Sequence, residues 1–199
     1  MQLIPTYLPS INYMSHLVKY PCIFSTQCNY QKQTHRNRSY IYGANGKLGL
    51  TIPIHHTKKN GHQKDCEVRI KWEENWQKQH WKSLESAYRS SPFFEFYEDD
   101  LKSIFFVESE FLMDYNYQLI ENLCDWLEVD FPNQKTNIYQ PLNPREEQLI
   151  LAKNKADILL NRYPQVFETK HGFISNLSIL DLLFNLGPES STYLNNNIH

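Results

Sequence analysis

The chain has 199 residues, of which 41% are hydrophobic and 14% aromatic, and its formal net charge is −2 with neutral histidines. This length fits one domain with its own core, residues 1–199, and the composition excludes a disordered chain. The small net charge excludes a global attraction to nucleic acid or anionic membranes. No run of eighteen apolar residues predicts a membrane span, and Pro5 and Pro9 interrupt the N-terminus in a way that no secretion signal shows. Four scattered cysteines without a C-x-x-C pair favour reduced thiols in a cytoplasmic protein.

The first quarter of the chain predicts a βαβ unit followed by a β-hairpin. Residues 3–8 predict a short buried strand, Ser10 can cap a helix with an apolar face, and residues 22–26 predict a second strand. The loop after Leu8 would then lie at the carboxyl end of the first strand, where such folds bind ligands. Residues 39–42 and 48–54 predict the hairpin, with its turn at Asn45 and Gly46.

The remainder predicts mostly helices. One helix over residues 76–88 has a clear inward face, made of Trp76, His80, Trp81, Leu84, Ala87 and Tyr88. Further predicted elements are strands at 66–72 and 136–140 and helices from about 95, at 115–128, at 143–163 and from 175 or 176 to 187, followed by a frayed tail. The predicted fold class is α/β, or α+β, with a βαβ start, a hairpin and a mostly helical C-terminal half packed on the sheet.

Positive charge and tyrosines are concentrated in one stretch, Gln31 to Gly46. Lys32, Arg36 and Arg38 stand among tyrosines, and no acidic residue occurs before Asp65. If this stretch is extended, the two arginines point to the same face and suit bidentate binding of phosphate or carboxylate. The structural alternative is pairing with carboxylates from later in the chain, such as Glu95, Glu98 or Asp99.

Other features favour ordinary structural explanations. His80 on an apolar helix face is either a core histidine or a general base. The spacing of His55, His56, His62 and Cys66 fits no standard zinc site and favours a polar loop without a metal. The loop before the first helix has the position of the phosphate-binding H-x-G-H of nucleotidylyl transferases, but lacks its glycine and histidine spacing. Dinucleotide, P-loop and hydrolase-elbow motifs are absent, and the basic patch is too short to predict nucleic-acid binding.

Three co-linear blocks carry a family resemblance. PTYLPSINYMSHLV, NYQKQTHRNRSYIYGANGKLGLTIPI and NWQKQHWKSLESAYRSSPFFEFYEDDL resemble consecutive blocks of the WbqC-like family over roughly residues 3–101, and HGFISNLSILDLLFNLGPES resembles the C-terminal block of one branch. The resemblance implies a bacterial cytoplasmic protein associated with O-antigen or other surface-polysaccharide gene clusters, whose activity is not established. The family commonly has acidic residues where Thr26 and Gln27 stand, and an aromatic residue where this chain has His35. If those acids bind a metal or act as a base, the resemblance implies altered or lost activity here.

Two hypotheses for function follow. The first is a transferase acting on a nucleotide sugar or an activated acyl donor, with Tyr7 and Tyr13 lining the cleft and His80 or His35 as the base. The donor phosphate would be held by the intact basic core of the family signature, Lys32, Arg36, Asn37 and Arg38. The second is a non-catalytic binding or assembly partner in the same pathway. Neither hypothesis specifies a cofactor.

Overall fold

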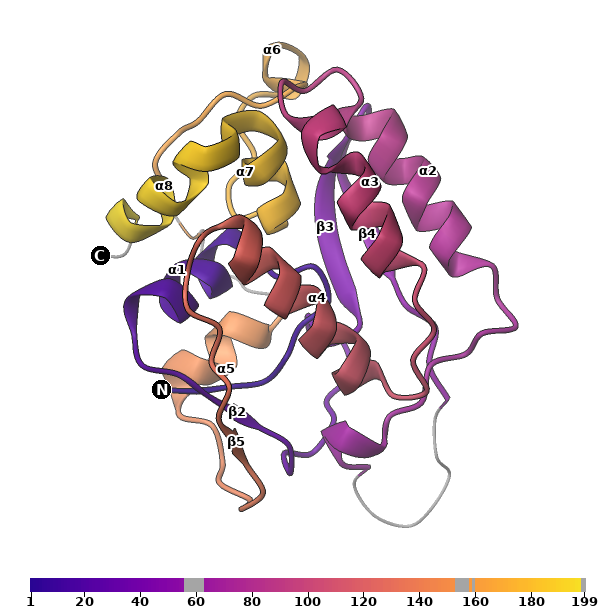
Figure 1. The fold of residues 1–199 in the computed structure, drawn as a ribbon, viewed down its shortest axis with the longest axis vertical. Coiled ribbons are helices and arrows are strands. Elements are labelled where there is room, and N and C mark those ends of the chain that lie inside the picture. The colour runs from indigo at the N-terminus through magenta and orange to yellow at the C-terminus, as the bar shows by residue number, and fades with distance from the viewer. Residues whose placement is uncertain (56–62, 153–157, 159, 198–199) are drawn as a thin grey trace.

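The computed structural model describes residues 1–55, 63–152, 158 and 160–197. Figure 1 shows an α/β protein in which small strands are surrounded by helices, many of them from the C-terminal half. The elements in chain order are β1 Gln2–Leu3, α1 Ile11–Lys19, β2 Ile23–Ser25, β3 Arg38–Gly43, β4 Gly46–Thr51, α2 Trp76–Tyr88, α3 Phe94–Phe105, α4 Leu112–Trp126, β5 Lys135–Thr136, α5 Pro144–Ile150, α6 Glu168–His171, α7 Ile179–Leu186 and α8 Ser190–Asn196. The mixed α/β class expected from the sequence is confirmed.

The βαβ start is also confirmed. Strands β1 and β2 pair in parallel, β5 adds to the other side of β2, and α1 connects the first two. Ser10 caps α1 through its hydroxyl, which accepts a hydrogen bond from the Tyr13 amide at 3.3 Å. The first strand is shorter than predicted because residues 4–9 leave the sheet as buried irregular chain. There the Tyr7 amide donates to the His35 carbonyl instead.

The hairpin lies between helices, with α7 on one side of β3 and α2 on the other (Figure 1). Its register runs from Arg38 opposite Thr51 to Gly43 opposite Gly46. The turn therefore falls on Ala44 and Asn45, one residue earlier than predicted, because Gly46 already belongs to β4. The Tyr88 hydroxyl and the Tyr42 amide, 3.0 Å apart, tie α2 to this hairpin.

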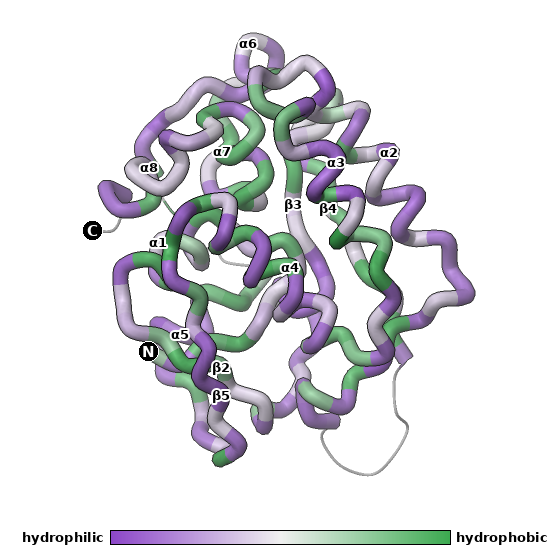
Figure 2. The backbone as a smooth tube through the Cα atoms, viewed as in Figure 1, coloured by the Kyte–Doolittle hydropathy of each residue, from purple (hydrophilic) through white to green (hydrophobic). Residues whose placement is uncertain are grey.

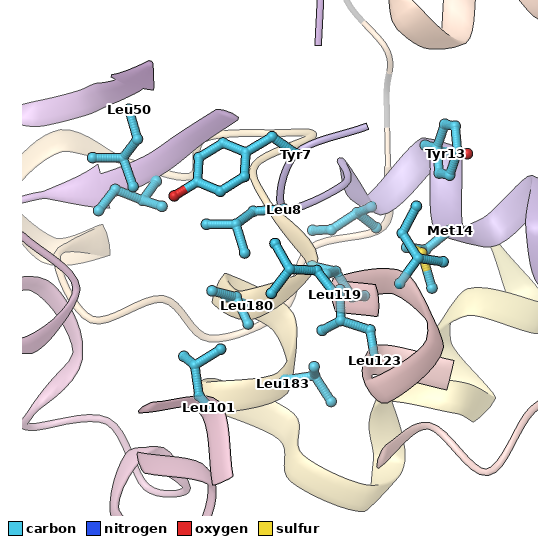
Figure 3. Close-up of a cluster of buried hydrophobic side chains, with 14 of the residues drawn as sticks. Tyr7, Leu8, Tyr13, Met14, Leu50, Leu101, Leu119, Leu123, Leu180 and Leu183 are labelled. Carbon is cyan, nitrogen blue, oxygen red and sulfur yellow. The ribbon is translucent and has the colours of Figure 1, made fainter. Parts of the chain in front are cut away.

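The helices place their predicted apolar faces inward. All six residues of the predicted inward face of α2 are buried. In Figure 2 the hydrophobic segments gather toward the interior, and Figure 3 shows leucines of α3, α4 and α7 meeting beside Leu8 and Leu50. No helix in the described ranges combines the length and apolarity that crossing a bilayer requires.

A buried carboxylate fastens the C-terminal block to the hairpin side. Asp181 on α7 accepts hydrogen bonds from the Tyr88 hydroxyl at 2.7 Å, the Tyr163 hydroxyl at 2.5 Å and the Gln165 amide at 2.9 Å. Burial raises the pKa of Asp181, and these three donors act in the opposite direction. Gln165 in turn exchanges hydrogen bonds with the backbone of Ile174, so the network also fixes the chain before α7.

Four predictions about these elements were wrong. Residues 66–72 form no strand; Asp65–Glu67 is a 3-10 turn, and only isolated bridges follow at Arg69 and Ile70. Helix α5 ends at Ile150 because Leu151 is extended and bridges to Thr34.

At the C-terminal end, α7 begins after Ser178, not at residue 175 or 176. Asn176 has a positive φ of 54°, outside the right-handed helical region. The tail expected to fray forms α8, which packs on α1.

The junction after α7 gives a stability prediction. Gly187 has φ +53°, and a Cβ there would lie 2.6 Å from the Phe93 ring. We expect Gly187→Ala to destabilise by about 2–4 kcal/mol, since steric overlap adds to left-handed strain. Gly46→Ala is the matched control: its φ is +99° but no atom lies within 4 Å, so only strain of about 1–2 kcal/mol applies. Equal losses in urea unfolding would contradict the packing argument.

Candidate functional site

The basic segment around Lys32, Arg36 and Arg38 is connected to three other parts of the chain by backbone hydrogen bonds. The His35 carbonyl accepts from Tyr7, the His35 amide donates to the Ile150 carbonyl, and the Ile52 amide donates to the Asn37 carbonyl. The segment thus joins the N-terminal loop, the end of α5 and the end of β4. Residues 35 and 36 form a turn and β3 begins only at Arg38. Strand alternation therefore does not place Arg36 and Arg38 on one face.

Arg36 is fully engaged inside the protein. Its Nε lies 2.7 Å from Asp65 Oδ1, and both side chains are 3% exposed. Its two terminal nitrogens donate to Thr34 Oγ1 at 3.3 Å and the Asn29 carbonyl at 3.4 Å. Structural pairing therefore holds for Arg36, although with Asp65 and not with the later carboxylates named above. Glu98, one of those carboxylates, pairs with Arg89.

Arg38 has different surroundings. It lines a hollow of about 380 Å³, called here the basic hollow, together with Tyr30, Lys32, Gln33, Asn37, Thr51, Ile52, Pro53, Ile54 and Lys71. Arg38 Nε is buried without a hydrogen-bond partner among the described residues, and no carboxylate of these residues lies within ion-pair distance of it. The basic hollow therefore combines three cations with a lining that contains no acid.

Asn37 and Tyr30 complete this hollow. The Asn37 side-chain amide donates to the Ile52 carbonyl at 2.9 Å, while its oxygen is buried without a partner in the described part of the chain. Burial raises the pKa of Tyr30 to about 12, although the charges of Arg36 and Arg38 act in the opposite direction. Tyr30 consequently keeps its proton at neutral pH and can donate it in a hydrogen bond.

The same segment also contributes to a larger hollow. This large hollow has a volume of about 720 Å³, which is ordinary for a small-molecule site. Among the described residues its lining also contains no acid: Ser10, Asn12, His35, Tyr40, Lys47, Gln148, Leu149, Leu151, Ala152, Ile158, Leu160, Arg162, Gly172, Phe173, Ile174, Ser175 and Asn176. Segment 33–40 therefore contributes residues to two ligand-sized hollows.

His35 lines the large hollow as a neutral imidazole. Its Nδ1 lies 3.2 Å from the Arg38 carbonyl, which can only accept, so Nδ1 carries the proton and Nε2 keeps its lone pair. Burial lowers the pKa of His35 to about 4, and the charges of Lys47 and Arg38 act in the same direction. A neutral imidazole with an unprotonated Nε2 can accept a proton at physiological pH.

Lys47 is a cation of the large hollow without a carboxylate partner in the described part of the chain. Its ammonium nitrogen lies 4.2 Å from the centre of the Tyr40 ring, in a cation–π contact. Burial lowers the pKa of Lys47, and no described carboxylate pairs with it. Arg162, the other cation in the lining, already pairs with Glu168.

The remaining candidates from the sequence lie in the core. Tyr7 and Tyr13 are fully buried (Figure 3), and the Tyr13 hydroxyl donates to the Ile4 carbonyl at 3.0 Å. The Tyr7 hydroxyl bonds His80 Nδ1 at 2.9 Å, and burial lowers the pKa of His80 to about 4. None of these three residues lines either hollow.

The N-terminus of α1 offers no free donors to a phosphate. The Ile11 amide donates to the Leu177 carbonyl, the Asn12 amide to the Asn176 side chain at 2.9 Å, and the Tyr13 amide to Ser10. An anion near this helix must therefore be bound by side chains.

Of the three positions that depart from the family pattern, His35 lines the large hollow, whereas Thr26 and Gln27 line neither hollow. Thr26 donates to the Thr136 carbonyl at 3.0 Å, and Gln27 accepts from the Lys64 ammonium at 2.6 Å. Among the candidate metal ligands, His56 and His62 lie outside the described residues, and His55 is exposed. The described residues contain no group of three His, Cys, Asp or Glu placed to hold a metal ion.

The fold defines an α/β protein with two hollows beside one basic segment. Residues 4–158 match the sequence profile of the WbqC-like protein family, so the chain belongs to that family. It is also 27% identical over 194 residues to the uncharacterized protein Rv1507c of Mycobacterium tuberculosis, covering 83% of each chain. No solved structure matches it significantly.

Sequence analysis missed several lining residues. Lys71 of the basic hollow comes from a segment predicted as a strand, and its approach to Arg38 depends on tertiary contacts. Tyr40 and Lys47 lie in or beside the basic stretch of the sequence. Their side chains come into contact because of the register of the hairpin, which the sequence alone did not give. The C-terminal family block supplied a usable signal, because residues 172–176 line the large hollow.

The ion pair of Arg36 gives a second stability prediction. Asp65→Ala leaves a buried guanidinium unpaired and should cost about 3–5 kcal/mol, whereas the double change Arg36→Met with Asp65→Leu should recover much of that loss. Glu110→Ala, which breaks the exposed pair with Arg69, is the control and should cost about 1 kcal/mol or less. Similar unfolding free energies for Asp65→Ala and Glu110→Ala would sink this assignment.

The buried histidines predict acid sensitivity. The folded pKa of His80, about 4, lies below its ordinary value of 6.5, so between these values the unfolded state binds more protons and stability falls with falling pH. From pH 7.5 to pH 5 His80 should contribute a loss of about 2 kcal/mol. Urea unfolding of His80→Gln should show a correspondingly smaller loss, while exposed His55→Gln behaves as the parent. If His80→Gln lost as much stability between pH 7.5 and pH 5 as the parent protein, this prediction would be refuted.

Proposed function

We propose that this WbqC-like protein is a cytoplasmic transferase of bacterial surface-polysaccharide assembly that uses a phosphate-bearing sugar or acyl donor. The observation that supports the proposal most is the unpaired guanidinium of Arg38, next to two lysines in a hollow without acids. Cations in such surroundings favour an anionic ligand, and a guanidinium suits phosphate oxygens geometrically.

In the proposal, Lys32, Arg38 and Lys71 bind the donor phosphate and Asn37 orients it. Arg36 acts indirectly, because its pairing with Asp65 fixes the turn that precedes Arg38. His35 is the general base, since it faces the large hollow and hydrogen-bonds the backbone of Arg38. His80, the other candidate base, already forms a hydrogen bond with the Tyr7 hydroxyl through its Nδ1.

A thermal-shift panel tests this proposal. Pyrophosphate, nucleotide sugars and acyl-coenzyme A compounds should include at least one ligand that raises Tm. Arg38→Gln should weaken that ligand about tenfold, the usual scale for losing a charged hydrogen bond. Arg69→Gln is the matched control, because Arg69 is exposed, pairs with Glu110 and lines neither hollow.

Two results would argue against the transferase. A panel without any stabilising ligand would favour the non-catalytic assembly partner. If Arg38→Gln and Arg69→Gln weaken ligand binding equally, the interaction is a general charge attraction. Increasing the salt concentration would then raise the Kd by the same factor in both variants.

A further inference from the structure

We infer that the large hollow binds an aliphatic acyl group, so that the group transferred is acyl and not a sugar. This inference rests on the proposed function and chooses between its two donor classes. It starts from the lining of the hollow, in which the end of α5 and the chain before α7 supply a set of aliphatic side chains together with the polar Gln148, Arg162, Ser175 and Asn176.

The apolar part of the lining comes from the end of α5 and the chain before α7. It consists of Leu149, Leu151, Leu160 and Ile174, and Phe173 adds an aromatic ring. These side chains have no hydrogen-bonding groups, so sugar hydroxyls placed against them would lose their water partners without replacement. An aliphatic chain placed there instead gains from leaving water.

The hairpin and the turn before it add polar groups to the lining. These are His35 with its Nε2 lone pair, Tyr40 and Lys47. An acyl thioester matches this combination, because its chain is apolar while its carbonyl oxygen accepts hydrogen bonds. The Lys47 ammonium, without a carboxylate partner among the described residues, is a cationic donor among these groups.

The chemistry balances with an acyl thioester as donor. The hydroxyl or amine of the acceptor gives its proton to His35 Nε2 as its oxygen or nitrogen forms a bond to the carbonyl carbon. The carbon–sulfur bond then breaks, and the leaving thiolate takes the proton from the imidazolium. No oxidant, reductant or metal is needed, and His35 returns to its starting state.

The test is isothermal titration of the full chain with coenzyme A and its acetyl, butyryl and hexanoyl thioesters. Affinity should rise about fourfold for each added methylene that enters the hollow. Leu151→Ser should flatten this rise without weakening coenzyme A itself. Leu48→Ser is the matched control, because Leu48 is 39% exposed and Leu151 37%, yet Leu48 lines neither hollow.

Failure of the acyl inference is distinguishable from failure of the proposed function. Arg38→Gln should weaken every member of the series equally and leave the chain-length dependence intact. If coenzyme A binds through Arg38 but all chain lengths bind equally, the phosphate site stands and the acyl inference is overturned. Tighter binding of a nucleotide sugar, weakened by Leu151→Ser, would also overturn it. If Arg38→Gln changes nothing, the phosphate site itself is lost.

Discussion

The buried ion pair of Arg36 and Asp65 is the interaction on which the site depends. Both groups are almost completely removed from water, 2.7 Å apart, and either charge alone would be strongly unfavourable there. The pair connects the turn before β3 to the 3-10 turn at Asp65–Glu67. Asn116 on α4 adds to this connection by donating to the Arg36 and Pro5 carbonyls at 2.7 and 3.2 Å. The backbone that presents His35 and Arg38 is therefore held from both sides.

This constraint divides the cations of one short stretch into two kinds. Arg36 pairs with the Asp65 carboxylate and donates through both terminal nitrogens, whereas Arg38, two residues later, has no carboxylate partner in the described chain. The first charge is neutralised inside the fold, and the second is the one that the proposed function assigns to a ligand. Because the N-terminal amides of α1 are already bonded within the protein, an anion bound there would have to be held by side chains.

Local patterns predicted much of the fold. The 3.6-residue periodicity of α2 and the cap at Ser10 were recovered because they depend on neighbouring residues alone. The strand expected at residues 66–72 was wrong because a long-range ion pair draws Asp65 into a turn. A long-range contact also ends α5 early, because Leu151 bridges to Thr34 instead of continuing the helix.

Predicting the site was harder than predicting the helices. Charge imbalance pointed to a stretch that contributes residues to both hollows, but alternation assigned Arg36 and Arg38 to one face as though both were extended. The identity of the carboxylate that neutralises Arg36, and therefore which arginine stays unpaired, depends on which distant segments meet. Local sequence patterns do not show which distant segments come into contact. The family blocks, however, identified segments that line the hollows, including residues 172–176.

The most direct test of this division is nitrogen-15 NMR of the arginine Nε–H groups during titration with pyrophosphate. The account predicts a slowly exchanging Arg36 signal, assigned by its loss in Arg36→Lys, that does not move. The Arg38 signal, assigned through Arg38→Lys, should shift in a saturable way. A shift of Arg36 with an unmoved Arg38 would contradict the account.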